Sequence, residues 1–93
     1  MANYYHMHLS IYSLKEIIFE GEAISISLPT PLGEMTVLDH HIPLVSIVSK
    51  GEIRWILLNP EQGRGMDEIT KTIPFRGGIL EIQPESKVVV LAQ

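Results

Sequence analysis

Apolar and polar residues alternate along most of the chain with the two-residue period of half-buried β-strands. In Tyr5–Ile11 and Ala23–Leu28 every second side chain is apolar. The second run ends at Pro29-Thr30-Pro31, because proline lacks the amide hydrogen that a strand donates to its neighbour. Further segments of β-type composition are Ile17–Phe19, Glu34–Leu38, Leu44–Val48, Ile53–Leu58, Ile69–Phe75, Gly78–Gln83 and Lys87–Ala92. The pattern therefore predicts a chain built from short strands.

Turn residues separate these segments at spacings of roughly ten residues, as in β-sandwiches and barrels. The turn signals are Gly21, Gly33, Lys50-Gly51, Asn59-Pro60, Gly77-Gly78 and Pro84-Glu85-Ser86. No helical period is long enough to compete, and the polar stretch Asn59–Asp67 is typical of a surface loop. We therefore expect a single all-β domain over residues 1–93, in which two antiparallel sheets share one core.

Composition narrows the possible partners and locations. The 93 residues carry a formal charge of −4 without a cluster of Lys and Arg, which disfavours nucleic acid and anionic lipid. The chain has no cysteine, so neither a disulfide nor a thiolate zinc site can form. Apolar runs such as Val88–Ala92 are far shorter than the roughly 18 residues of a membrane span. With no signal-peptide pattern at the N-terminus, we expect a cytosolic protein without direct membrane insertion.

Two histidine pairs are the first candidates for a metal site, because histidine is the commonest metal ligand. His6 and His8 lie on one face of a predicted strand, and His40 and His41 are adjacent in a predicted turn. The pairs belong to separate segments and lack the ligand spacing of zinc motifs. The spacing favours exposed histidines over a metal centre.

Other candidate groups point weakly to chemistry. Asp39 beside His40 could act in acid–base catalysis, but the sequence contains no nucleophile elbow. Gly63-Arg64-Gly65 and Gly77-Gly78 lack the ending of a phosphate-binding loop and are better explained as turns. Glu34 at a turn tip is typical of a solvated charge. Trp55, which stands among aliphatic residues, is expected to pack in the core.

The order of several stretches resembles the epsilon subunit of F-type ATP synthases. His8–Ile11 leads to Ile18–Ala23 as the family's first strand leads to its Phe-x-Gly turn. Gly33–Val45 is similar to its Gly-Glu-Leu-Gly-Ile stretch and the following Gly-His-Ala-Pro-Leu-Leu. Lys50–Arg54 resembles Pro-Gly-x-Ile-Arg, and Gly77–Pro84 matches the Gly-Gly-hydrophobic-x-Glu-Val-x-Pro ending. The likeness is collinear and extends over essentially the whole chain.

This resemblance implies a ten-stranded β-sandwich of two five-stranded sheets. It implies a non-catalytic subunit of the central stalk, which turns with the rotor and links the gamma subunit to the membrane c-ring. Ion translocation, expected to be of protons, is thereby coupled to ATP synthesis in the catalytic head. No cofactor and no metal are implied for this domain. Its expected location is peripheral, at the cytoplasmic face of the bacterial inner membrane.

Matching positions in the family imply two contact sites. The c-ring loops are expected to contact Gly33, Glu34 and Met35, and the gamma subunit to contact Ser13, His41 and Ser46. Family members continue into a two-helix hairpin that can block ATP hydrolysis. Because only Gln93 follows the last predicted strand, we expect this form to support assembly without that inhibition and without binding ATP.

Two alternatives remain open from the sequence. The chain could be a free-standing β-sandwich interaction module, or a small metal-binding protein that uses its histidines. Co-purification with gamma and c subunits distinguishes the first alternative from a rotor subunit, and a metal titration tests the second.

Overall fold

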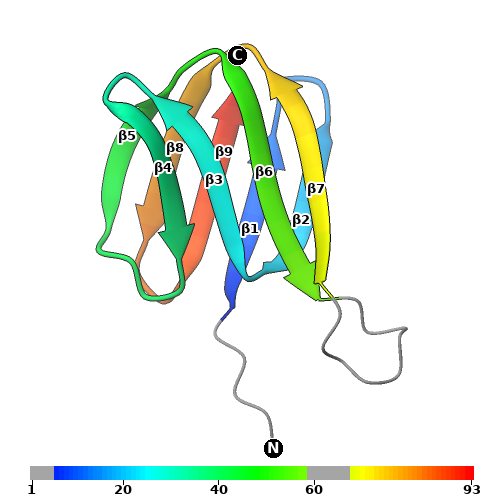
Figure 1. Ribbon diagram of the computed structural model, residues 1–93, viewed down its shortest axis with the longest axis vertical. Helices are drawn as coiled ribbons and strands as arrows, with labels where there is room; N and C mark the ends of the chain where they lie inside the picture. The colour runs from blue at the N-terminus through cyan, green and yellow to red at the C-terminus, as the bar shows by residue number, and fades with distance from the viewer. Residues whose placement is uncertain (1–5, 59–67) are drawn as a thin grey trace, which may run out of the picture.

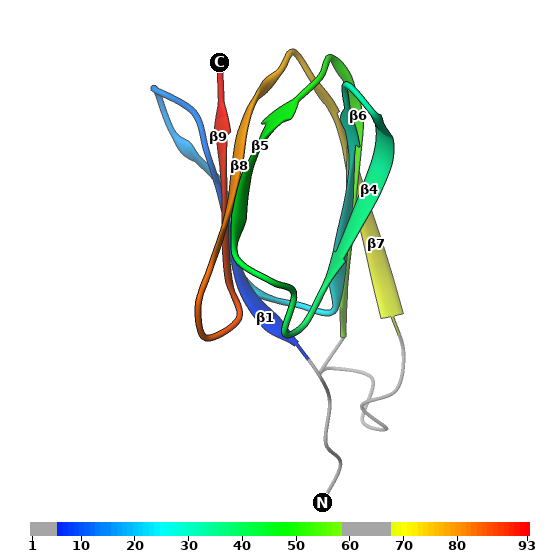
Figure 2. The same cartoon turned by 90° about the vertical axis from the view of Figure 1, so that its left-hand side faces the viewer.

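The computed structural model describes residues 6–58 and 68–93, which form two β-sheets packed face to face (Figures 1 and 2). The strands in these residues are β1 (Met7–Tyr12), β2 (Ile17–Ala23), β3 (Ser25–Thr30), β4 (Gly33–Leu38), β5 (Leu44–Val48), β6 (Gly51–Leu58), β7 (Glu68–Phe75), β8 (Gly78–Gln83) and β9 (Lys87–Ala92). Each corresponds to one segment predicted from the alternation. The all-β sandwich is therefore confirmed, although the described strands number nine rather than ten, with five in one sheet and four in the other.

The five-stranded sheet has the order β2-β1-β9-β8-β5, and the four-stranded sheet has the order β4-β3-β6-β7. All neighbours are antiparallel except β1 and β9, which run parallel with Leu9 opposite Val88. The expectation of purely antiparallel sheets is therefore wrong at this pair. The two strands come from opposite ends of the chain, so no local turn signal could reveal their direction. The predicted loop Asn59–Asp67 lies outside the described residues.

Inward-facing side chains of both sheets form one apolar core. The buried apolar residues are Met7, Leu9, Ile11, Ala23, Ile26, Leu28, Val37, Val48, Ile53, Trp55, Phe75, Leu80, Ile82, Val88 and Val90. Burial of each large aliphatic side chain contributes about 1.5–3 kcal/mol. Trp55 lies among them with its ring centroid 5.3 Å from that of Phe19, as its aliphatic neighbours predicted.

The strand directions place the turns at two ends of the sandwich. The turns that follow β1, β3, β5 and β7 lie at one end together with the C-terminal residue, and we call this the Gln93 end (Figure 1). Two backbone bonds hold that end together: the Ser49 amide donates to the Pro29 carbonyl oxygen, and the Gln93 amide donates to that of Gly77, both at 2.9 Å. The turns after β2, β4 and β8 lie at the opposite end. The described residues contain no helix that is long and apolar enough to cross a membrane.

Candidate protein-docking surface

A row of apolar side chains crosses the outer face of the five-stranded sheet. Its members, one from each strand, are Ile17, Tyr12, Leu91, Ile79 and Ile47. Each stands directly opposite the next in the strand register. Ile47 and Leu91 expose 63% and 50% of their surface. We call this set the outer row. A contiguous exposed apolar strip of this kind marks a surface that another protein covers.

An irregularity in β1 and β2 completes the outer row. Ile11 stands opposite Phe19, but the register shifts so that Tyr12 stands opposite Ile17. The shift leaves Ile17 exposed while Phe19 packs against the core. In a β-bulge, two residues of one strand stand opposite a single residue of the next, and the side chains that follow change direction. Sequence alternation alone does not locate such a shift.

The neighbouring positions on the same face continue the exposed apolar surface only in part. Val45 on the edge strand β5 is exposed, but Glu81 stands opposite it. On the four-stranded sheet, the row across the outer face is polar: Thr36, Ser27, Arg54 and Thr72. These two rows therefore differ in chemistry, although the outer face of the four-stranded sheet also exposes Leu38 on β4. The sequence contains a signal for the apolar row. In β5 and β9 both odd and even positions are apolar, a pattern that indicates strands covered on both faces.

The three positions expected to contact gamma are spread along the five-stranded sheet. Ser13 follows β1 at the Gln93 end, where its Oγ accepts hydrogen bonds from the amides of Lys15 and Glu16 at 3.2 Å. His41 lies in the turn before β5, at the opposite end. Ser46 on β5 is half-buried and stands opposite Leu80 of β8, which is buried. A single partner that touches Ser13 and His41 has to run along the length of this sheet.

The three positions expected to contact the c-ring begin β4, directly after the β3–β4 turn at the Gln93 end. Gly33 has a φ of +119°, a conformation that side chains rarely adopt. Glu34 is exposed, whereas the Met35 side chain packs against the core. Leu32, which the sequence reasoning missed, is fully exposed at the tip of this turn. The Thr30 hydroxyl braces the tip, since it donates to the Gly33 carbonyl oxygen at 2.7 Å and accepts from the Leu32 amide at 3.2 Å.

His6, His8 and His40 pair with carboxylates, whereas the His41 ring lies against the Ile42 carbonyl oxygen. His8 on β1 lies 3.4 Å from Glu20 and 3.5 Å from Glu22 on β2, and His6 also pairs with Glu22. Within residues 6–58 and 68–93, no three His, Asp or Glu side chains are arranged to hold a metal ion. These contacts are cross-strand pairs on an exposed edge, which contribute modestly to strand pairing.

The Asp39 carboxylate contacts the Ser86 hydroxyl and the His40 ring. The Ser86 hydroxyl donates to one of its carboxylate oxygens, and the other lies 3.2 Å from the exposed ring of His40. Only 10% of the Asp39 side chain is accessible. Asp39 precedes β5 and Ser86 precedes β9, so the contact ties two turns together. This arrangement explains the carboxylate without an acid–base role.

The chain matches a known family over nearly all of its length. Residues 6–93 match the family described as ATP synthase, Delta/Epsilon chain, beta-sandwich domain. The ATP synthase epsilon chain of Bordetella parapertussis is 38% identical over 86 residues, which are 92% of this chain and 55% of that protein. That of Neisseria meningitidis is 35% identical over 92% of this chain and 56% of its own length. The chain thus spans about half the length of these relatives.

Solved structures share the fold at low sequence identity. A chain in the OSCP/F1/c-ring assembly of Euglena gracilis mitochondrial ATP synthase superimposes with a TM-score of 0.76 at 20% identity, over 94% of this chain and 50% of that one. A chain in the central stalk and c-ring structure of the Tetrahymena thermophila mitochondrial enzyme gives a TM-score of 0.72 at 9% identity, over 94% and 63%. At these identities the likeness establishes the architecture.

Proposed function

Because the chain belongs to the ATP synthase delta/epsilon β-sandwich family, we propose that it is the sandwich of a central-stalk rotor subunit in a rotary F-type ATP synthase. In this role it binds the gamma subunit on one surface and the c-ring loops on another. It thereby helps to transmit rotation driven by proton flow to the catalytic head. The chemistry of ATP takes place in other subunits, and the sandwich is a non-catalytic, peripheral component at the cytoplasmic face of a bacterial inner membrane.

The outer row is the observation that carries the proposal. Permanent interfaces are more apolar than the rest of a protein surface. The five-stranded sheet exposes an apolar strip across all of its strands, whereas the corresponding row of the other sheet consists of Thr, Ser and Arg side chains. The row runs across all five strands, beside Ser13 at one end of β1. We therefore assign the gamma contact to the outer face of this sheet, extending along it toward His41.

The β3–β4 turn supports a second contact, to the c-ring. Leu32 and Glu34 project at the Gln93 end, where Gly33 and the Thr30 hydroxyl fix the backbone. A turn held in one conformation loses little entropy when it docks. Contacts on the sheet face and at one end of the sandwich let the domain bind two partners at once, as a coupling subunit has to do.

Gamma binding by surface variants tests the proposal. Ile79→Asp places a charge in the outer row, at a side chain that is 47% exposed. Thr72→Asp makes the matched change on the outer face of the four-stranded sheet. We expect wild type and Thr72→Asp to co-purify with gamma, and Ile79→Asp to bind at least tenfold more weakly while keeping its circular dichroism spectrum. Equal binding by all three proteins would place the contact elsewhere, and absence of binding by wild type would overturn the proposed function.

A further inference from the structure

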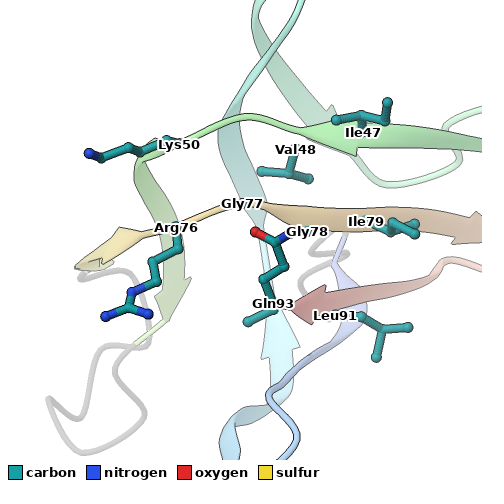
Figure 3. A pocket seen from close by; sticks show the side chains of 10 residues that line it. Ile47, Val48, Lys50, Arg76, Gly77, Gly78, Ile79, Leu91 and Gln93 are labelled. Atoms are coloured by element: carbon teal, nitrogen blue, oxygen red, sulfur yellow. The ribbon is translucent and has the colours of Figure 1, made fainter.

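A shallow depression of about 440 Å³ lies where the outer row meets the Gln93 end. Figure 3 shows its two sides: Ile47, Ile79 and Leu91 lie toward one, and Lys50 and Arg76 extend toward the other. The depression therefore has an apolar side, which belongs to the outer row, and a cationic side, which does not.

The fold brings the two cations together from separate turns. Val48 at the end of β5 stands opposite Gly78 at the start of β8, so that Lys50 and Arg76 come from neighbouring turns. Gly77 lets the backbones approach: a side-chain carbon there would lie 3.3 Å from the Val48 carbonyl oxygen and 4.0 Å from the Lys50 nitrogen. The placement of the cations is thus fixed by backbone packing, although their side chains reach into solvent.

No carboxylate in the described residues forms an ion pair with Lys50 or Arg76. Within residues 6–58 and 68–93, the side chains that contact carboxylates within ion-pair distance are Arg54 and the imidazoles of His6, His8 and His40. Lys50 and Arg76 stand outside this set, in a chain whose net charge is −4. Two neighbouring cations repel each other, and a carboxylate from another molecule relieves that repulsion.

We propose that this depression receives a protein segment that carries an acidic side chain next to apolar ones. The apolar residues cover Ile47, Ile79 and Leu91, and the carboxylate lies between Lys50 and Arg76. The inference rests on the proposed function and deepens it, because the segment belongs to the subunit that docks on the outer row. The cations fix the register of that subunit along the sheet, a task that apolar contacts perform poorly because they are not directional.

A protein carboxylate suits the site better than a lipid headgroup. Recognition of anionic membranes typically uses clusters of 4–8 Lys and Arg residues, and this depression offers two. Its apolar side is formed by side chains of adjacent strands, about 4.8 Å apart, and a protein segment can cover these with apolar side chains of its own. Because the apolar side of the depression belongs to the outer row, the same partner supplies the apolar side chains and the carboxylate.

The test compares two neutralised pairs of lysine and arginine. Lys50→Gln/Arg76→Gln removes the cations of the depression, and Arg54→Gln/Lys71→Gln removes two charges from β6 and β7 of the four-stranded sheet. At low ionic strength we expect the first double variant to bind gamma about tenfold more weakly than wild type, the combined size of two exposed ion pairs. The control should stay within about twofold. The difference should shrink as salt screens the charges.

Charge exchange identifies the acidic partner and separates the possible failures. Lys50→Glu/Arg76→Glu should bind poorly, and one Asp→Lys or Glu→Lys change in gamma should restore binding. Unchanged affinity of the neutralised variant, in an experiment where Ile79→Asp does weaken binding, overturns this inference and leaves the proposed function standing. Sedimentation with phosphatidylglycerol vesicles that depends on Lys50 and Arg76, combined with unchanged gamma binding, would also overturn it, in favour of a lipid ligand.

Discussion

The guanidinium of Arg54 on β6 binds the carboxylate of Glu34 on β4, with 2.8 Å between Nη2 and Oε2. The contact crosses the intervening strand β3 diagonally, since Glu34 stands opposite Pro29 and Arg54 opposite Ser27. From the sequence Glu34 is a lone charge at a turn tip, but the sheet supplies it with a cation 20 positions away. A cation on any partner that docks at Glu34 would therefore have to share its carboxylate with Arg54 or displace Arg54.

The Glu34–Arg54 pair is expected to contribute little to stability. Both side chains are about half exposed, and exposed ion pairs contribute roughly 0.2–1 kcal/mol. Glu34→Ala and Arg54→Gln should each lower the free energy of unfolding by about that amount, and the double variant should lose no more than either single change. Urea denaturation of the four proteins measures this cycle. Fully additive losses would show that the two side chains do not interact in solution.

Contact with the c-ring should involve the tip of the β3–β4 turn. Because Leu32 is fully exposed beside Glu34, we expect cysteine at position 32 or 34 to crosslink to a c-ring loop in the assembled enzyme. Glu34→Ala should weaken coupling mildly without preventing assembly, since one exposed pair is small. Cysteine at position 70, on the outer face of β7, is the control and should stay unlinked. Failure of both turn positions to crosslink would remove the ring contact from this turn.

The sequence predicted which residues face the core but not how the strands neighbour one another. Alternation assigns Leu9 and Ile26 to the interior correctly, because a two-residue period fixes the parity of every position in a strand. The outer row depends instead on register between strands, including the parallel pairing of Tyr12 with Leu91. Such pairings join residues distant in the sequence, so an exposed apolar strip becomes visible only after the strands are ordered.

The sequence likewise predicted the elements that carry the candidate contacts, but not which of their side chains face outward. The resemblance implies contacts at Gly33 and Glu34, which are exposed at the start of β4, and at Met35, whose side chain packs against the core. Ser46 faces the interior, whereas its exposed neighbours on β5 are Val45 and Ile47. Matching positions between two family members identifies the strand or turn that makes a contact. It does not identify which of two adjacent side chains in that element faces outward.

Trp55 offers a test of the core. It is 3% exposed, and its indole nitrogen has no hydrogen-bond partner among the described residues. Trp55→Ala should cost about 3–5 kcal/mol because it leaves a large cavity. Trp55→Phe should cost much less, since it keeps an aromatic ring beside Phe19 and loses no hydrogen bond. Chemical unfolding followed by circular dichroism measures both. Equal losses for the two variants would indicate a partner for the indole nitrogen.

Gly78 is required by the close approach of two backbones. A side-chain carbon at this position would lie 1.9 Å from the Leu91 carbonyl oxygen, so β8 and β9 would have to separate. Overpacking typically costs about 1–3 kcal/mol, and because backbone atoms cannot rotate away we expect Gly78→Ala at or above the upper end of that range. At Gly21 the same carbon would meet the Phe19 side chain at an ordinary 3.4 Å, so Gly21→Ala is the control. Thermal unfolding should show the larger drop in melting temperature for Gly78→Ala, and similar values for both variants would contradict so close an approach of β8 to β9.

The isolated chain should self-associate through the outer row when no partner covers it. Apolar strips that are buried in permanent complexes remain exposed in the separated subunit, and their burial against a second copy is favourable. We expect the apparent mass in sedimentation equilibrium to rise with protein concentration. Ile47→Asp should keep the chain monomeric over the same range, because two copies would bring the introduced carboxylates into an apolar contact. Thr72→Asp, on the polar sheet, should associate like wild type. Addition of gamma should break up the self-associated chains, since gamma and a second copy would compete for the same strip. If self-associated chains still bind gamma in full, the two contacts use different surfaces.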